Sequence, residues 1–99
     1  MTICAPSDCM TMTEVRAGVD QVDRELVALL ARRFGYMDAA ARIKPERSAV
    51  RDEARKAQVI AQARAAAAAA GLPDTFIADL WERLVEASIA YELEAFDRR

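Results

Sequence analysis

Apolar residues recur at steps of three and four along the first half of the chain, which is the spacing of one face of an α-helix. These positions are Val15, Val19, Val22, Leu26, Leu29, Leu30, Met37 and Ala40. Thr11, with Glu14 three residues later, forms a capping-box pattern, and no proline follows until Pro45. The pattern predicts one long helix over residues 13–44.

A helix of that length would extend roughly 48 Å at about 1.5 Å per residue. This is longer than a globule of 99 residues is wide, so the rest of the chain cannot cover the apolar face. We therefore expect a homodimer in which the matching helices of two subunits pack along each other.

Two further helices follow a short polar loop over residues 45–51. Asp52 offers an N-cap for the second helix, which runs through the alanines of residues 65–70 and stops at Gly71. Asp74 offers a cap for the third helix, whose apolar positions are Phe76, Ile77, Leu80, Trp81, Leu84, Val85, Ile89, Leu93 and Phe96. The expected lengths are roughly 32, 19 and 23 residues. The predicted fold class is all-α, a three-helix subunit with a long first helix.

The composition, 54% hydrophobic and 30% charged, fits one globular domain. We expect residues 1–10 to form a flexible N-terminal segment and residues 11–99 a single helical domain. Cys4 and Cys9 both lie in that segment, and the chain contains no histidine, so a zinc-type ligand set is excluded. We expect reduced thiols and neither a metal nor another cofactor.

Charge and hydropathy argue against two classes of partner. The 14 Lys and Arg residues are interspersed with 16 Asp and Glu residues, so the chain lacks the broad basic stripe of nucleic-acid-binding proteins. Residues 1–10 lack the features of a signal peptide, and no segment approaches the roughly 20 apolar residues that span a bilayer. We expect a cytoplasmic protein with no nucleic-acid or membrane partner.

Polar residues interrupt the apolar faces of the first and third helices. Arg33 and Lys44, eleven residues apart, continue the stripe of the first helix, and Ser88 and Glu92 fall within that of the third. Because a buried carboxyl needs a partner, one interpretation is a structural ion pair of Glu92 with Lys44 or Arg33. Long basic side chains can also reach solvent from the edge of a seam.

The other interpretation is a binding site. Arg16 and Arg55 each lie one step off an apolar stripe. Several cations together with a hydroxyl and a carboxyl suit a small dicarboxylate, because arginine binds carboxylates bidentately. Without histidine or a metal set, nucleophilic and metal catalysis have little support.

The order of these residues resembles the all-helical class of chorismate mutases over nearly the whole chain. The matching motifs are Val15-Arg16, Asp20-x-x-Asp23, Leu29-Leu30-x-Arg32-Arg33, Ala41-x-x-Lys44, Val50-Arg51-Asp52-x-x-Arg55 and Ser88-x-x-x-Glu92. The resemblance implies an intertwined homodimer in which Arg16 reaches the site of the partner subunit. The other site residues would come from one chain.

The resemblance also implies a role for each residue. Lys44 and Glu92 would be catalytic and contact the ether oxygen of the breaking bond, and Lys44 would also contact a carboxylate. Arg33 and Arg55 would hold the carboxylates of the substrate. Asp52 and Ser88 would line the pocket.

The chain departs from the chorismate mutase pattern at two positions. Most bacterial members carry glutamine where this chain has Glu92. In fungal relatives a glutamate there must be protonated to donate a hydrogen bond, which implies catalysis that depends on pH. The family's glutamate that holds the substrate hydroxyl is replaced by Lys56. Isochorismate-pyruvate lyases, a sister branch, also lack that glutamate.

Two further segments resemble the lyase branch. They are Pro6-x-Asp8-Cys9 and Arg32-Arg33-x-x-Tyr36-x-x-Ala39-Ala40-x-x-x-Lys44. Ser88 and Asp52, in contrast, resemble the mutases. The expected function is therefore chorismate mutase, which rearranges chorismate to prephenate. One alternative is an isochorismate-pyruvate lyase that forms salicylate and pyruvate, and another is a non-catalytic helical dimerisation module.

Overall fold

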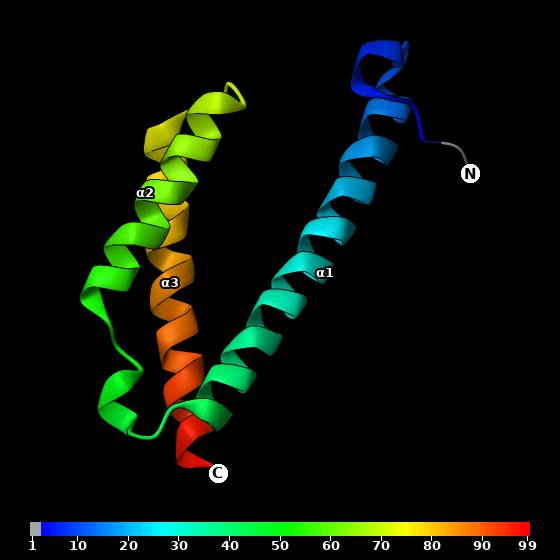
Figure 1. Cartoon of the computed structure of the whole chain (residues 1–99). Helices are drawn as coiled ribbons and strands as arrows, with labels where there is room; N and C mark the ends of the chain where they lie inside the picture. The colour runs from blue at the N-terminus through cyan, green and yellow to red at the C-terminus, as the bar shows by residue number, and fades with distance from the viewer. Residues whose placement is uncertain (1–2) are drawn as a thin grey trace. The chain divides into compact units, whose positions relative to one another are not determined.

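The computed structural model describes residues 3–99, and the regular structure in that range is entirely helical. Three long helices, α1 (Met12–Ile43), α2 (Glu53–Ala69) and α3 (Asp74–Asp97), are joined by shorter segments (Figure 1). Two short 3-10 turns, η1 (Pro6–Asp8) and η2 (Arg47–Ala49), precede α1 and α2. The predicted all-α class with three helices is confirmed. The chain divides into two compact units between Gly35 and Tyr36.

The first turn of α1 is held by the predicted capping box. The backbone N–H of Glu14 donates to Thr11 Oγ1 at 3.1 Å, and the Thr11 hydroxyl donates to Glu14 Oε1 at 3.1 Å. The same carboxylate oxygen also accepts the N–H of Met10 at 3.0 Å, and the Cys4 thiol donates to Glu14 Oε2 at 2.8 Å. These hydrogen bonds lower the pKa of Glu14, that from Cys4 most strongly, and stabilise the helix start.

The segment before α1 contains η1 and two free thiols, Cys4 and Cys9. The expectation of flexibility over residues 1–10 stays a prediction, and its part on residues 1 and 2 lies outside the described residues.

The apolar stripe of α1 is exposed along the part of the helix that lies in the first unit. Val19 is 52% exposed and Leu29 is 58% exposed, and Val22 and Leu26 between them are similarly open. Leaving such a continuous apolar face in water is unfavourable. The helix that carries it is 32 residues long, as the sequence predicts.

The start and end of α2 follow the predicted local signals. Asp52 Oδ1 accepts the backbone N–H of Arg55 at 3.0 Å, which makes Asp52 the N-cap. At the other end Leu72 N–H donates to the Ala67 carbonyl and Gly71 N–H to the Ala68 carbonyl, the two bonds of a Schellman motif. Gly71 has a φ of 75°, which glycine adopts without steric penalty.

The start of α3 differs from the prediction. The helix begins at Asp74 itself, and Pro73 is the N-cap without a side-chain hydrogen bond, so Asp74 is not the cap. Its carboxylate accepts a charge-assisted hydrogen bond from Arg64 of α2 at 2.8 Å, which lowers the pKa of Asp74. The Asp74 side chain therefore joins α3 to α2.

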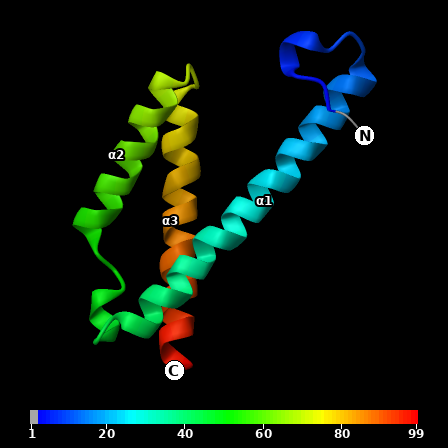
Figure 2. The same cartoon turned by 45° about the vertical axis from the view of Figure 1, so that its right-hand side comes forward.

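Helices α2 and α3 lie side by side and form most of the core of the second unit (Figure 1, Figure 2). Val50, Val85 and Ile89 are buried at its centre. The partly buried residues packed against them are Val59, Ile60, Trp81, Leu93 and Phe96. No helix within residues 3–99 has the length and hydropathy needed to cross a bilayer.

Candidate active site

A lysine and a glutamate meet on the inward face of the second unit. Lys44, just after the end of α1, places Nζ at 2.7 Å from Oε2 of Glu92 on α3. The side chain of Glu92 is 5% exposed and that of Lys44 is 30% exposed. A carboxylate so far removed from water requires a cationic or donor partner, and Lys44 supplies it. This arrangement is compatible with the structural ion pair and with a pair of groups aimed at a ligand.

Ser88 lies one turn before Glu92 on the same buried face of α3. Its hydroxyl donates to the Leu84 carbonyl at 2.7 Å, the local bond that serine often makes inside a helix. The pattern of the sequence identified this break in the apolar stripe, and the structure places both polar residues among buried ones. Ser88 and Glu92 therefore share a face with Val85 and Ile89.

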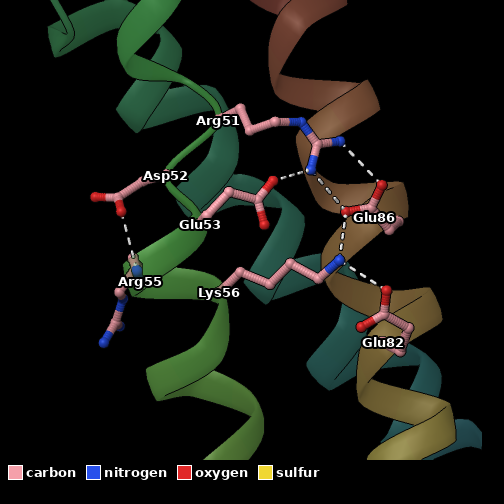
Figure 3. Close-up of polar contacts among 7 residues, drawn as sticks. All are labelled: Arg51, Asp52, Glu53, Arg55, Lys56, Glu82 and Glu86. Carbon is pink, nitrogen blue, oxygen red and sulfur yellow. Dashed lines mark hydrogen bonds and ion pairs between the residues drawn. The ribbon is translucent and has the colours of Figure 1, made fainter.

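Asp52, the N-cap of α2, and Arg55, in the first turn of α2, are exposed. Beyond the N-cap bond, Arg55 Nη1 donates to Gln58 Oε1 at 2.7 Å on its own helix. Figure 3 shows the side chains of Asp52 and Arg55 pointing away from α3. The structure thus places Lys44 next to Glu92, on the face of α3 that also carries Ser88. Asp52 and Arg55, the other two predicted pocket residues, lie on the side of α2 that faces away from α3 (Figure 3).

Lys56, at the position where the family resemblance implies a glutamate, faces α3 and is paired with two carboxylates. Its Nζ lies 2.7 Å from Glu82 Oε1 and 3.0 Å from Glu86 Oε2, and its side chain is 16% exposed. These two carboxylates raise the pKa of Lys56, that of Glu82 most strongly. A lysine carries the opposite charge to a glutamate and offers hydrogen-bond donors but no acceptor.

Arg51 extends this cluster at the entrance to α2. It donates to Glu86 from both Nη atoms, at 2.9 and 3.1 Å, and to Glu53 at 2.9 Å (Figure 3). Arg51 and Lys56 together lower the pKa of Glu86 to about 2. Our sequence reasoning did not find this cluster. The spacing of Glu82 and Glu86, one helical turn apart, places both carboxylates on one face of α3 and could have indicated a site for a cation.

Arg16 and Arg33 lie on the part of α1 that belongs to the first unit. They are seventeen residues apart, which is roughly 25 Å along a helix. Two arginines so far apart on a rigid helix cannot hold one small molecule from the same chain. If both act on the same kind of ligand, they belong to two different sites.

A hollow of about 720 Å³ lies along the first turns of α1, but it does not suit a dicarboxylate. It is lined by Ile3, Cys4, Pro6, Cys9, Val15, Gly18, Val19, Gln21, Val22, Asp23 and Glu25. None of these residues is a cation, and the two charged ones are acidic. We therefore do not assign the substrate to this hollow.

The sequence of the chain matches a known family over most of its length. Residues 15–93 match the description of chorismate mutase type II, and the chain belongs to this family. Among individual proteins, it is 28% identical over 89 residues to an isochorismate pyruvate lyase of Pseudomonas aeruginosa. That alignment covers 90% of this chain and 88% of the relative. The predicted family, including its lyase branch, is confirmed, and the family is one of enzymes.

Proposed function

We propose that this chain catalyses the rearrangement of chorismate to prephenate, the reaction of chorismate mutases. The observation that carries the proposal is the contact of Lys44 with Glu92 at 2.7 Å on the buried face of α3. The family match over residues 15–93 supports the same reaction. The rearrangement is intramolecular: an ether C–O bond breaks, a C–C bond forms, and no atom is gained or lost.

Such a reaction needs no nucleophile from the protein. The enzyme must hold a compact conformer of the substrate and stabilise the negative charge that develops on the ether oxygen. In our proposal Arg33 and Arg55 bind the two carboxylates, and Asp52 and Ser88 line the pocket. Lys44 and a protonated Glu92 donate hydrogen bonds to the ether oxygen.

We also propose that the active form is a homodimer joined along α1. The exposed apolar stripe from Val15 to Leu30 supports this assembly, because a second copy of the stripe would remove both from water. Arg16 would then serve the site of the partner subunit. The distance of roughly 25 Å between Arg16 and Arg33 along one helix is what such sharing requires.

A specific observation favours a second candidate, isochorismate pyruvate lyase. Lys56 stands where mutases carry the glutamate that binds the substrate hydroxyl, and it is engaged by Glu82 and Glu86. A site without that acceptor lacks one hydrogen bond by which it could recognise the hydroxyl of chorismate. The relative from Pseudomonas aeruginosa is named for the lyase reaction.

One assay tests the proposal and separates the candidates. Purified protein is incubated with chorismate and, in parallel, with isochorismate, and the products are identified by chromatography. Prephenate from chorismate supports the mutase, whereas salicylate with pyruvate from isochorismate supports the lyase. A preparation from cells that do not express the protein, purified identically, controls for contaminating enzymes. Inertness toward both compounds would contradict the proposal and favour a helical dimerisation module.

A further inference from the structure

Arg99 contacts the end of α1 at the residue to which we assign catalysis. Its Nη1 donates to the carbonyl of Ala41 at 3.1 Å and to the carbonyl of Lys44 at 2.6 Å. The guanidinium carbon lies 3.9 Å from the centre of the Phe96 ring, which packs against the cation. In both views the end of α3 lies beside the end of α1 (Figure 1, Figure 2).

The carbonyl of Ala41 needs a donor because of the proline that follows Lys44. In a continuing helix the N–H of residue 45 would donate to the carbonyl of Ala41, but Pro45 has no N–H. The last bond of this kind runs from Lys44 N–H to the Ala40 carbonyl at 2.9 Å. Ala41 is only 2% exposed, so an unpaired carbonyl there would be destabilising. Arg99 supplies the missing donor, and its charge complements the negative end of the α1 dipole.

A second contact fixes the loop beyond Pro45. Arg47 donates to both carboxylate oxygens of Asp97, at 2.9 and 3.3 Å. Three contacts therefore hold the chain around Lys44 to α3 and to Arg99, which follows α3. The ammonium of Lys44 contacts Glu92, its carbonyl contacts Arg99, and the loop after it contacts Asp97. We refer to Asp97 and Arg99 with their contacts on Ala41, Lys44 and Arg47 as the α3 clamp.

We propose that Arg99 is a positioning residue for Lys44, acting through the backbone of Lys44 and not by touching the substrate. This inference rests on the proposed function. A flexible lysine places its ammonium accurately only if its backbone is fixed, and misplacement of a catalytic group by about 1 Å can reduce a rate about 100-fold. The clamp fixes that backbone to the same helix that carries Glu92.

Arg98 provides a matched control for substitution of Arg99. It is the adjacent arginine, its side chain is 64% exposed, and its contact with Glu94 is a surface pair at 4.0 Å. Surface pairs of this kind contribute little to stability. Arg98→Ala and Arg99→Ala thus remove the same side chain from neighbouring positions, and only the second removes the clamp.

The test compares steady-state kinetics of these variants on whichever substrate the parent turns over. We expect Arg99→Ala to lower kcat about 10-fold to 100-fold with a smaller change in KM, and Arg98→Ala to leave both nearly unchanged. In a Lys44→Ala background, Arg99→Ala should cause no further loss, because it acts through Lys44. A full additional loss in that background would overturn the proposal.

Restoring the backbone donor provides a second variant. Pro45→Ala restores the backbone N–H that a continuing helix would pair with the Ala41 carbonyl, so we expect Pro45→Ala/Arg99→Ala to recover part of the lost kcat. Hydrogen exchange at the Lys44 amide gives a readout that is independent of turnover, and we expect faster exchange in Arg99→Ala than in Arg98→Ala. Equal exchange in both would refute the clamp. An inactive parent would refute the proposed function and the catalytic meaning of the clamp, while hydrogen exchange would still decide whether Arg99 fixes Lys44.

Discussion

Lys44 Nζ lies 2.7 Å from Glu92 Oε2 although the two residues are 48 positions apart in the chain. The contact joins the end of α1 to the buried face of α3 and is the point on which the proposed chemistry depends. A lysine there can donate to a developing oxyanion, and the neighbouring carboxyl changes from acceptor to donor when it is protonated.

Removal of the lysine ammonium should abolish most of the activity. We expect Lys44→Ala to lose on the order of 2 to 4 kcal/mol of transition-state stabilisation, the range for losing an oxyanion-type donor. The measurement is kcat/KM on the substrate found by product identification, with circular dichroism to check folding. If a folded Lys44→Ala keeps kcat/KM within a few-fold of the parent, Lys44 has only a structural role.

Glu92→Gln tests whether the protonated carboxyl is the working form. Glutamine donates a similar hydrogen bond but does not titrate. The resemblance to the chorismate mutases implies a glutamate that donates a hydrogen bond, so we expect the parent to be most active at acid pH, whereas Glu92→Gln should stay active at neutral and alkaline pH. The measurement is kcat against pH for both proteins. Identical dependence of kcat on pH in both proteins would show that Glu92 serves only in a structural ion pair.

The uncovered stripe of α1 predicts a dimer. Sedimentation equilibrium at micromolar concentration should give twice the 10.9 kDa mass of the chain. Leu26→Asp, which introduces a charge into the stripe, should dissociate the dimer, and Asp20→Ala on the opposite face serves as its control. A folded parent that sediments as a monomer would contradict the proposed assembly.

Sharing of Arg16 between subunits predicts that two inactive variants complement each other. Arg16→Ala and Lys44→Ala should each be nearly inactive alone. After mixing, unfolding and refolding, each heterodimer has one site with both an intact Arg16 and an intact Lys44, so up to about a quarter of the parent activity should return. No recovery, with heterodimers demonstrated by mass spectrometry, would show that Arg16 does not act across the interface.

The cluster around Glu86 predicts a specific loss of stability in acid. Arg51 and Lys56 lower the pKa of Glu86 from its ordinary 4.5 to about 2 in the folded protein. A lowered pKa means that the folded state binds this proton less readily, so the stabilisation is complete above pH 4.5 and declines as pH falls toward 2. Thermal unfolding of Glu86→Gln should be less sensitive to pH across this window than that of the parent. Glu94→Gln, which alters an exposed carboxylate outside the cluster, should retain the sensitivity of the parent.

The local features of this fold could be predicted from the chain because neighbouring residues determine them. The capping box at Thr11 and Glu14, the N-cap at Asp52 and the left-handed Gly71 each depend on hydrogen bonds spanning a few residues. Periodicity likewise identified the polar breaks at Ser88 and Glu92, since it reports which residues share a helix face.

Contacts between distant residues required the tertiary structure. Lys56 contacts Glu82 and Glu86, Asp74 contacts Arg64 of α2, and Arg99 supplies the donor that Pro45 lacks. Periodicity identifies the face on which a residue lies but not the register in which two faces pack. A side chain with several acceptors in reach pairs according to that register, and the final geometry of Lys44 follows from it.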